Sequence, residues 1–271
     1  SALEEGRTLM AKDRKLFYLY SVLVFALIAT AVIAPYFAPY DPYTSSMQTS
    51  LLPPSSEHLF GTDKLGRDSF TRILYGMRIS IAMALGIVFI MSVVGTLVGI
   101  IAGFVGGKVD TLLMRFTDMV LAFPGIVLAI AIAGMLGGSI ANTILALSAV
   151  GWTRYARLAR SLTLKLAQQD FLAAAVTNGT RTSMIIWRHI APNLLPTIIL
   201  TAATDIGAMM MEIAGLSFLG FGAQPPTPEW GLMLNEGRQF IQTAPWLMVY
   251  PGVAILVVVA IFNLWGDSLR V

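Results

Sequence analysis

Residues 169–196, QDFLAAAVTNGTRTSMIIWRHIAPNLLP, are a polar, arginine-bearing island between two long apolar runs. The whole chain is 56% hydrophobic and only 12% charged, with a mean hydropathy of +0.74. These values lie well outside the range of soluble globular proteins. The sequence therefore predicts a membrane protein that crosses the bilayer several times, with the island as a loop between two crossings.

The apolar runs are long and uniform, which indicates helices rather than the alternating strands of a membrane barrel. We expect six membrane-spanning helices in an all-α fold. Their approximate ranges are 16–37, 79–104, 111–136, 140–158, 194–221 and 246–264.

The loop charges predict the orientation of the chain. With both termini in the cytoplasm, twelve basic residues lie at or near the cytoplasmic side: Lys12, Arg14, Lys15, Lys108, Arg115, Arg154, Arg157, Arg160, Lys165, Arg181, Arg188 and Arg270. Five lie on the opposite side: Lys64, Arg67, Arg72, Arg78 and Arg238. The positive-inside rule favours this orientation. The pI near 9.3 is therefore a consequence of topology and not a sign of nucleic-acid binding.

The sequence argues against an enzyme. It has no phosphate loop of the GxxxxGK[ST] type, no nucleophile elbow and no helical pair of metal-binding histidines. It has no cysteine, and the topology puts its two histidines, His58 and His189, on opposite sides of the membrane. We therefore expect no bound cofactor, and any ATP hydrolysis must come from another chain.

The island resembles the "EAA" coupling loop of ATP-binding-cassette (ABC) importer permeases. Ala174 and Ala175 followed by Gly179 fit the pattern, and Ala173 stands where the family has glutamate. Asp170 lies one helical turn upstream. His189 and Pro192 belong to the RHIAPN segment that follows at family-like spacing, where a structural hydrogen bond is the expected role of His189.

Two further segments resemble the dipeptide, oligopeptide and nickel subgroup of these permeases. Residues 61–68 read GTDKLGRD, matching the subgroup's GTDxxGRD signature, although such a cluster is also a typical turn. Residues 222–231 read GAQPPTPEWG, whose prolines exclude a continuous helix. The NEGR run at 235–238 and the FNLWGD run at 262–267 extend the match to nearly the whole chain.

The resemblance implies an ABC importer type I permease fold and a domain plan. Residues 1–15 form a cytoplasmic N-terminal segment, of which 1–9 look like an expression remnant before Met10. Residues 16–271 form the transmembrane permease domain, with outside loops 38–78 and 222–245 and the coupling segment 162–192.

The resemblance also implies partners and a location. These are a second homologous permease subunit, two ATPase subunits that hold ATP and Mg²⁺, an extracytoplasmic substrate-binding protein, and the lipid of a bacterial inner or plasma membrane. An autonomous channel or secondary transporter is the alternative from another class, but such a protein has no need of a cytoplasmic docking helix.

One face of the fifth expected helix carries candidate pathway residues. Asp205, Met209 and Glu212 fall at i, i+4 and i+7, so a helix places them on one face. A carboxylate at membrane depth normally faces the bundle interior or a wet cavity. We therefore expect this face to line the translocation route.

The DIGAMM run at 205–210 looks more like nickel permeases than dipeptide permeases. Thioether and carboxylate groups are able to contact a transition metal, although methionine is also a common packing residue. The preferred cargo is accordingly nickel or a nickel complex, and the alternative is a dipeptide or oligopeptide.

Two features predict helix packing. Gly95, Gly99 and Gly103 form a glycine stripe at i, i+4 and i+8, which permits close approach of a neighbouring helix. Pro124 interrupts the third expected span and predicts a kink there.

Overall fold

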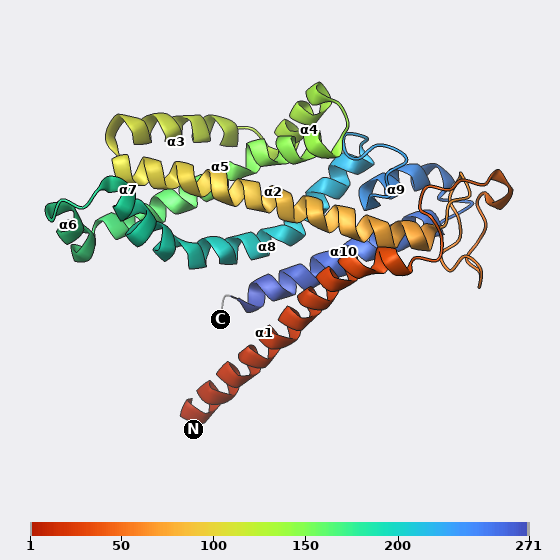
Figure 1. The fold of residues 1–271 in the computed structure, drawn as a ribbon, viewed down its shortest axis with the longest axis horizontal. Coiled ribbons are helices and arrows are strands. Elements are labelled where there is room, and N and C mark those ends of the chain that lie inside the picture. The colour runs from red at the N-terminus through yellow and green to blue at the C-terminus, as the bar shows by residue number, and fades with distance from the viewer. Residues whose placement is uncertain (1, 270–271) are drawn as a thin grey trace. The chain divides into compact units, whose positions relative to one another are not determined.

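The computed structural model describes residues 2–269, and the side chains of residues 2–13, 173, 174 and 176 lie outside what it describes. Among the described residues no β-strand forms, and one isolated bridge joins Thr62 to Asp68. The helical elements (Figure 1) are α1 (Ala2–Ile33), η1 (Ala34–Phe37), η2 (Met47–Thr49), α2 (Ser69–Val105), α3 (Gly107–Leu121), α4 (Gly125–Leu136), α5 (Ile140–Ala167), α6 (Asp170–Thr177), α7 (Thr182–Ile185), the π-helix η3 (Ile186–Ile190), α8 (Ala191–Phe218), α9 (Trp230–Gly237), η4 (Arg238–Phe240) and α10 (Trp246–Ser268).

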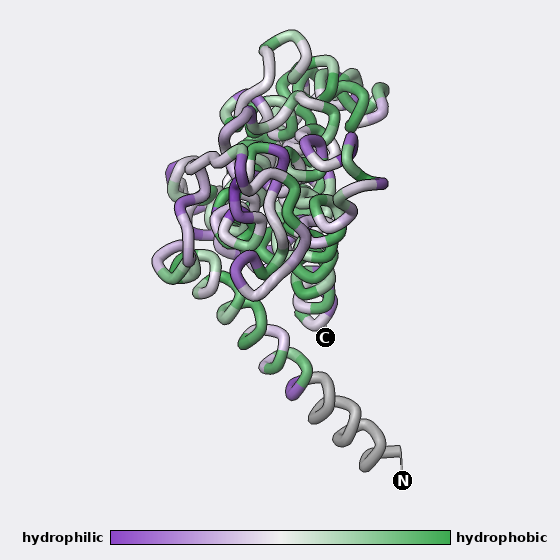
Figure 2. Tube along the Cα trace, turned by 90° about the vertical axis from the view of Figure 1, so that its right-hand side faces the viewer, coloured by the Kyte–Doolittle hydropathy of each residue, from purple (hydrophilic) through white to green (hydrophobic). Residues whose placement is uncertain are grey.

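Four stretches in the described part of the chain are long and apolar enough to cross a membrane: Arg14–Phe37, Ser69–Val105, Thr182–Phe218 and Trp246–Ser268. The bent pair of α3 and α4 makes a fifth when it is counted as one span. Figure 2 shows hydrophobic residues along the helices and hydrophilic residues gathered mainly in the connections. These spans confirm the all-α membrane fold.

The fourth expected span corresponds to α5, which is not among these apolar helices. This helix carries Arg154, Arg157, Arg160 and Lys165 in its second half and continues to Ala167. Each of the six expected ranges thus coincides with helical structure, but length and composition support four or five spans.

The second expected span begins earlier than its apolar run. Helix α2 starts at Ser69, so the irregular connection between the first two long helices ends near residue 68, about ten residues before the expected boundary at 78. The cause is a polar helix start, because the Oδ2 atom of Asp68 accepts the N–H of Thr71 at 2.7 Å. Such N-caps satisfy backbone donors that would otherwise lack partners.

The second outside segment also contains regular structure. Helix α9 begins at Trp230, directly after the proline-rich run, and η4 follows it within the range 222–245. The prolines do interrupt helical structure as expected, but only up to residue 229.

The third expected span is broken at Pro124. Helix α3 ends at Leu121, α4 starts at Gly125, and the two meet at 87°. Proline lacks an N–H, and it disfavours helical geometry at the residue before it, here Phe123. The predicted kink is confirmed, and it is large enough to separate two helices.

The chain divides into two compact units, each with its own packing. The first comprises residues 1–85, 133–144 and 203–271. In it, α10 packs against α1 and α9, and the indole N–H of Trp265 donates to Ser21 Oγ at 3.1 Å.

The second unit comprises residues 86–132 and 145–202, and the glycine stripe of α2 lies within it. A Cβ atom built on Gly99 would lie 2.7 Å from the Cβ of Ala159 on α5 and would also meet the Ala156 carbonyl oxygen. Gly95 and Gly103 meet the same helix. The glycine stripe therefore packs against the α5 backbone, as predicted.

We expect Gly99→Ala to destabilise the protein by about 1–3 kcal/mol, because the added methyl group would force the two helices apart. The measurement is the thermal unfolding midpoint of the purified complex. Gly86→Ala is the matched control on the same helix, since a Cβ there meets nothing within 4 Å. Equal midpoints for the two variants would contradict the packing role of the stripe.

Candidate functional site

The polar island folds into a short helix with a defined end. Helix α6 runs from Asp170, whose carboxylate favours a helix N-terminus, to Thr177. Gly179 then adopts a φ of +73°, and the Thr180 N–H donates to the Ala175 carbonyl at 3.1 Å. This hydrogen bond is that of a glycine-terminated helix end. Helix α6 therefore ends in a turn that requires the positive φ of Gly179.

The described side chains of α6 include a buried one, Leu172, and several exposed ones. Leu172 is buried, with 2% of its surface exposed, whereas Phe171 is 46% exposed. Asp170 and Gly179 are exposed and Ala175 is half-buried. The side chains of Ala173 and Ala174, which the sequence assigns to docking, lie outside the described residues, so their role stays a prediction.

The segment after α6 also combines buried and exposed apolar side chains. Ile185 and Ile190 are buried, whereas Met184 and Trp187 are exposed by 50% and 65%. The ring of His189 lies 6.2 Å from that of Phe171, centroid to centroid, which connects η3 to α6. The hydrogen bond at this residue is made by its backbone oxygen, which accepts the Asn193 Nδ2 group at 2.6 Å.

We define five exposed residues of this segment as the candidate docking surface: Phe171 and Arg181 and, in the first turns of the candidate span Thr182–Phe218, Met184, Trp187 and Arg188. All five are exposed, and three are large and apolar. Exposed aromatic and arginine side chains are typical of the residues that dominate protein–protein interfaces. Pro192 is also exposed and lies beside Trp187 along the wall of an apolar groove.

The candidate pathway residues on α8 are mostly buried. Asp205 and Met209 are 4% and 3% exposed, and Glu212 is half-buried. Both carboxylates have interaction partners. All three residues lie in α8, so their spacing places them on one face of that helix. Because Asp205 and Met209 are buried, they do not line an open surface in this structure. Their pathway role stays a prediction.

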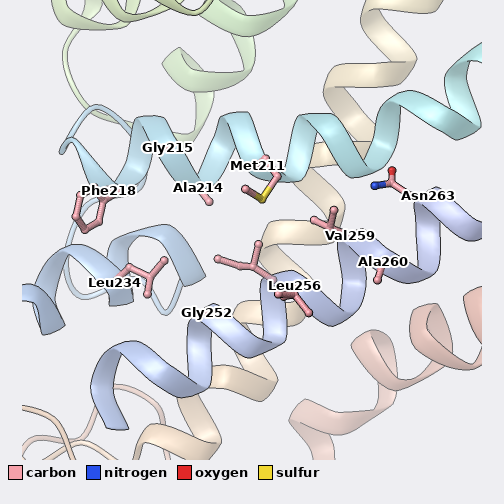
Figure 3. Close-up of a pocket in the computed structure, with 11 residues that line it drawn as sticks. Met211, Ala214, Gly215, Phe218, Leu234, Gly252, Leu256, Val259, Ala260 and Asn263 are labelled. Atoms are coloured by element: carbon pink, nitrogen blue, oxygen red, sulfur yellow. The ribbon is translucent and has the colours of Figure 1, made fainter. Parts of the chain in front are cut away.

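An open apolar groove lies beside this face, within the first unit. It has a volume of about 660 Å³ and is formed by α8, α9 and α10. Figure 3 shows the Met211 side chain pointing from α8 into the groove, with Phe218 and Leu234 at one end and Asn263 at the other. Met211 is 57% exposed. The accessible thioether of the methionine run is thus its third member and not Met209.

The two connecting segments that we expect outside the membrane meet in a buried ionic cluster, which we define as Asp63, Arg67, Arg72 and Glu236. Both arginine side chains are 1% exposed. Arg67 Nη2 lies 3.1 Å from each Glu236 oxygen, and Arg72 Nη2 lies 3.0 Å from Oε2. Arg67 Nε also donates to Asp63 at 2.6 Å. The GTDKLGRD and NEGR runs are therefore parts of one structure.

The sequence analysis identified the GTDKLGRD and NEGR runs separately, but it did not predict that they contact each other. Arg67 and Glu236 are 169 residues apart, and no local spacing relates them. Beside the cluster, His58 Nδ1 lies 2.9 Å from Asp68 Oδ1, so this histidine has a structural partner. Among the described residues, no group of three or more His, Cys, Asp or Glu side chains could hold a metal ion.

Glu229 joins α9 to the helices beside it. Its carboxylate accepts the N–H groups of Gly231 and Leu232, both at 2.9 Å, and the hydroxyl of Ser80 at 3.2 Å. Burial raises the pKa of this carboxyl above its ordinary value of 4.5, and the hydrogen bonds act in the opposite direction. At pH values between 4.5 and the raised pKa, this carboxyl is protonated in the folded state but largely ionised in the unfolded state. The free energy of unfolding therefore falls as the pH rises through that window.

Comparisons with known proteins agree with this geometry. Residues 95–270 match the sequence model of a family described as "binding-protein-dependent transport system inner membrane component". The dipeptide transport system permease protein DppC of Alkalihalophilus pseudofirmus is 42% identical over 96% of this chain and 85% of the relative. The nickel permease NikC of Escherichia coli K12 is 38% identical, over 92% of this chain and 91% of the relative.

A third relative and one solved structure extend the comparison. The glutathione transport system permease protein GsiD of Escherichia coli O6:K15:H31 is 45% identical over 92% of this chain and 83% of its own length. An inward-facing structure of the MetNI methionine ABC transporter matches with a TM-score of 0.60 at 16% identity, over 74% of this chain and 96% of that one. This likeness concerns the fold, which is that of a type I ABC permease.

We expect Glu236→Gln to destabilise the protein by about 3 kcal/mol, because it leaves Arg67 and Arg72 buried with less negative charge. For a chain of this size the thermal midpoint should fall by roughly 6–12 °C. Glu57→Gln is the control, because Glu57 is exposed and its change should cost less than about 0.5 kcal/mol. A midpoint unchanged by Glu236→Gln would show that the cluster does not hold the outside segments together.

Proposed function

Because this chain belongs to the family of binding-protein-dependent transport system inner membrane components, we propose that it forms one half of the translocation pathway of an ATP-driven importer. It is a membrane-embedded ABC permease subunit of the dipeptide, nickel and glutathione type and is not itself a catalyst. In our proposal, a second, homologous permease completes the pathway, two ATPase subunits supply ATP hydrolysis with Mg²⁺, and a substrate-binding protein delivers cargo from outside.

The observation that carries this proposal is the candidate docking surface. Phe171 is exposed on the short helix α6, and Met184 and Trp187 are exposed in the first turns of the long helical stretch Thr182–Phe218. Leu172 and Ile190 anchor these segments in the second unit. An autonomous channel or secondary transporter needs no exposed short helix anchored between two of its spans. A rigid helix that an ATPase subunit can push explains both the exposure and the anchoring.

The proposed mechanism is alternating access. ATP binding closes the ATPase subunits, α6 moves as a rigid lever, and the spans open outward to receive cargo before hydrolysis returns them to the inward-facing state. Nucleotide and cargo shift this equilibrium only to the extent that they bind its two states with different affinity. In the orientation we propose, both chain termini and α6 lie in the bacterial cytoplasm.

For the cargo we propose a small peptide or peptide-like molecule. Met209 and Met210 are 3% and 2% exposed, so their thioethers are packing groups in this structure. Nickel or a nickel complex is the second candidate, favoured by the DIGAMM run and by the exposed thioether of Met211.

The coupling proposal predicts that Gly179→Leu lowers cargo uptake per ATP hydrolysed by about tenfold. The variant forces a left-handed backbone on a residue with a side chain, at a cost of about 1–2 kcal/mol, and so displaces the end of α6. The assay is ATP-driven uptake with parallel ATPase measurement in proteoliposomes that contain the whole complex.

Gly106→Leu is the matched control for this test. Gly106 also has a positive φ, +67° against +73° at Gly179, and a Cβ at either position meets nothing within 4 Å. Gly106 also has a ψ of −162°, a backbone region that is essentially restricted to glycine, so this control carries at least as much strain as Gly179→Leu. It should nevertheless keep coupling, because it lies in the turn before α3. Normal coupling in Gly179→Leu, or equal losses in both variants, would refute the docking role of α6.

The cargo proposal predicts that Met209→Leu and Met211→Leu both retain uptake, because leucine nearly conserves the volume of methionine and changes packing by less than about 1.5 kcal/mol. The measurement compares uptake of radiolabelled dipeptide with that of ⁶³Ni²⁺, supplied with and without a chelator. A loss of nickel uptake alone, with ATP-driven cycling intact, would refute the peptide proposal and support nickel.

A further inference from the structure

Helix α3 exposes two different faces. Leu112, Phe116 and Met119 are exposed by 72%, 52% and 59%, and they lie along one apolar face. Lys108, Thr111, Arg115 and Asp118 are also exposed. Their spacing of three, four and three residues places them on one face of the helix, next to the apolar one. We call these four residues the α3 polar stripe.

The packed side of the helix is distinct from both exposed faces. Thr117 is fully buried. Asp110 pairs with Arg160 of α5, whose Nη2 atom lies 2.6 Å from Oδ2, and both side chains are partly covered. This pair fastens α3 to α5 within the second unit and leaves the polar stripe facing outward.

The deep end of the stripe carries a second, exposed ion pair. Arg157 Nη2 lies 2.6 Å from Asp118 Oδ1, yet 54% of the arginine side chain and 60% of the aspartate side chain are exposed. From Lys108 to Asp118 the stripe extends about 15 Å along the helix at 1.5 Å per residue. If α3 enters the membrane near Lys108, Asp118 and Arg157 lie well inside the bilayer.

The other end of the stripe is hollowed. A depression of about 520 Å³ is lined by Gly107, Lys108, Thr111 and Arg115 and, from the apolar face, by Leu112. It is large enough for several water molecules or for a small polar molecule. The two cations beside it have no ion-pair partner among the described residues.

Acyl chains are an unsuitable environment for this face. Helix α3 is part of a candidate membrane span, and charged groups within spans almost always face the bundle interior or a water-filled cavity. Packing the exposed ion pair against an apolar subunit surface would also be costly, because both charges would lose water. The neighbouring apolar face can contact lipid, but the stripe requires water.

We propose that the α3 polar stripe, together with Arg157, lines the cytoplasmic half of the translocation pathway. This inference rests on the proposed function. The stripe offers both signs of charge at depth and two cations near the cytoplasm, which suits a small polar cargo that carries a carboxylate and an amine. Asp118 and Arg157 are then positioned to exchange their mutual contact for contacts with such a cargo.

The test uses the absence of native cysteine in this chain. Thr111→Cys and Arg115→Cys report on the stripe, and Phe116→Cys and Met119→Cys are their matched neighbours on the apolar face, outside the depression. Each variant, assembled with its cognate subunits in nanodiscs, is treated with a charged methanethiosulfonate reagent and with a lipid-soluble maleimide. Mass spectrometry of this chain measures modification without nucleotide and after trapping with ATP and vanadate.

We expect the charged reagent to modify both stripe positions at least tenfold faster than the apolar positions in the nucleotide-free complex. Trapping should slow modification of the stripe at least tenfold, because the cytoplasmic side closes. A modification rate that is the same with and without trapping would show that the stripe is exposed to water outside the pathway. Modification by the maleimide alone would show that the stripe faces lipid. Protection from both reagents in both states would mean a subunit interface.

Each of these last three outcomes overturns the inference. ATP-driven uptake by the unmodified complex is measured in parallel. If uptake and ATPase coupling are intact while the stripe behaves in one of those ways, only the pathway assignment fails. If the chain does not support ATP-driven uptake at all, the proposed function fails, whatever the reagents report.

Discussion

A charged side chain that leaves water needs an oppositely charged partner, and this constraint explains where several of the described acidic and basic groups of this chain lie. Arg67 and Arg72 are buried but share Glu236, and Asp110 is paired with Arg160. The charges that remain exposed in a candidate span, Asp118 above all, need water instead. The contact between the 61–68 loop and α9 and the proposed assignment of the pathway both follow from meeting this requirement locally.

Sequence patterns predicted the parts of the fold that depend on neighbouring residues. Apolar runs located the helices, the stripe of Gly95, Gly99 and Gly103 located a helix contact, and Pro124 located a break. The short α6 also lies where the resemblance of the island to a coupling loop placed it. Each of these features is encoded within one or two helical turns, so a single sequence is enough to detect it.

The parts that escaped prediction depend on contacts between distant residues. The start of α2 at Ser69 reflects a cap and an ionic cluster with Glu236, and hydropathy alone placed that start about ten residues too late. The spacing of Asp205 and Met209 correctly gave a shared face, but only tertiary packing shows that both are buried. Met211, the exposed thioether, follows them in sequence and lies on a different side of α8.

The ionic cluster has a consequence for recognition on the outer side. A loop of some thirty residues without long helices would ordinarily lose considerable conformational entropy when a partner binds it. Here Arg67 and Arg72 already hold the loop against α9, so much of that ordering happens when the protein folds. A protein that docks against this loop meets a preorganised surface, and its affinity is determined more by complementarity than by the cost of ordering a flexible chain.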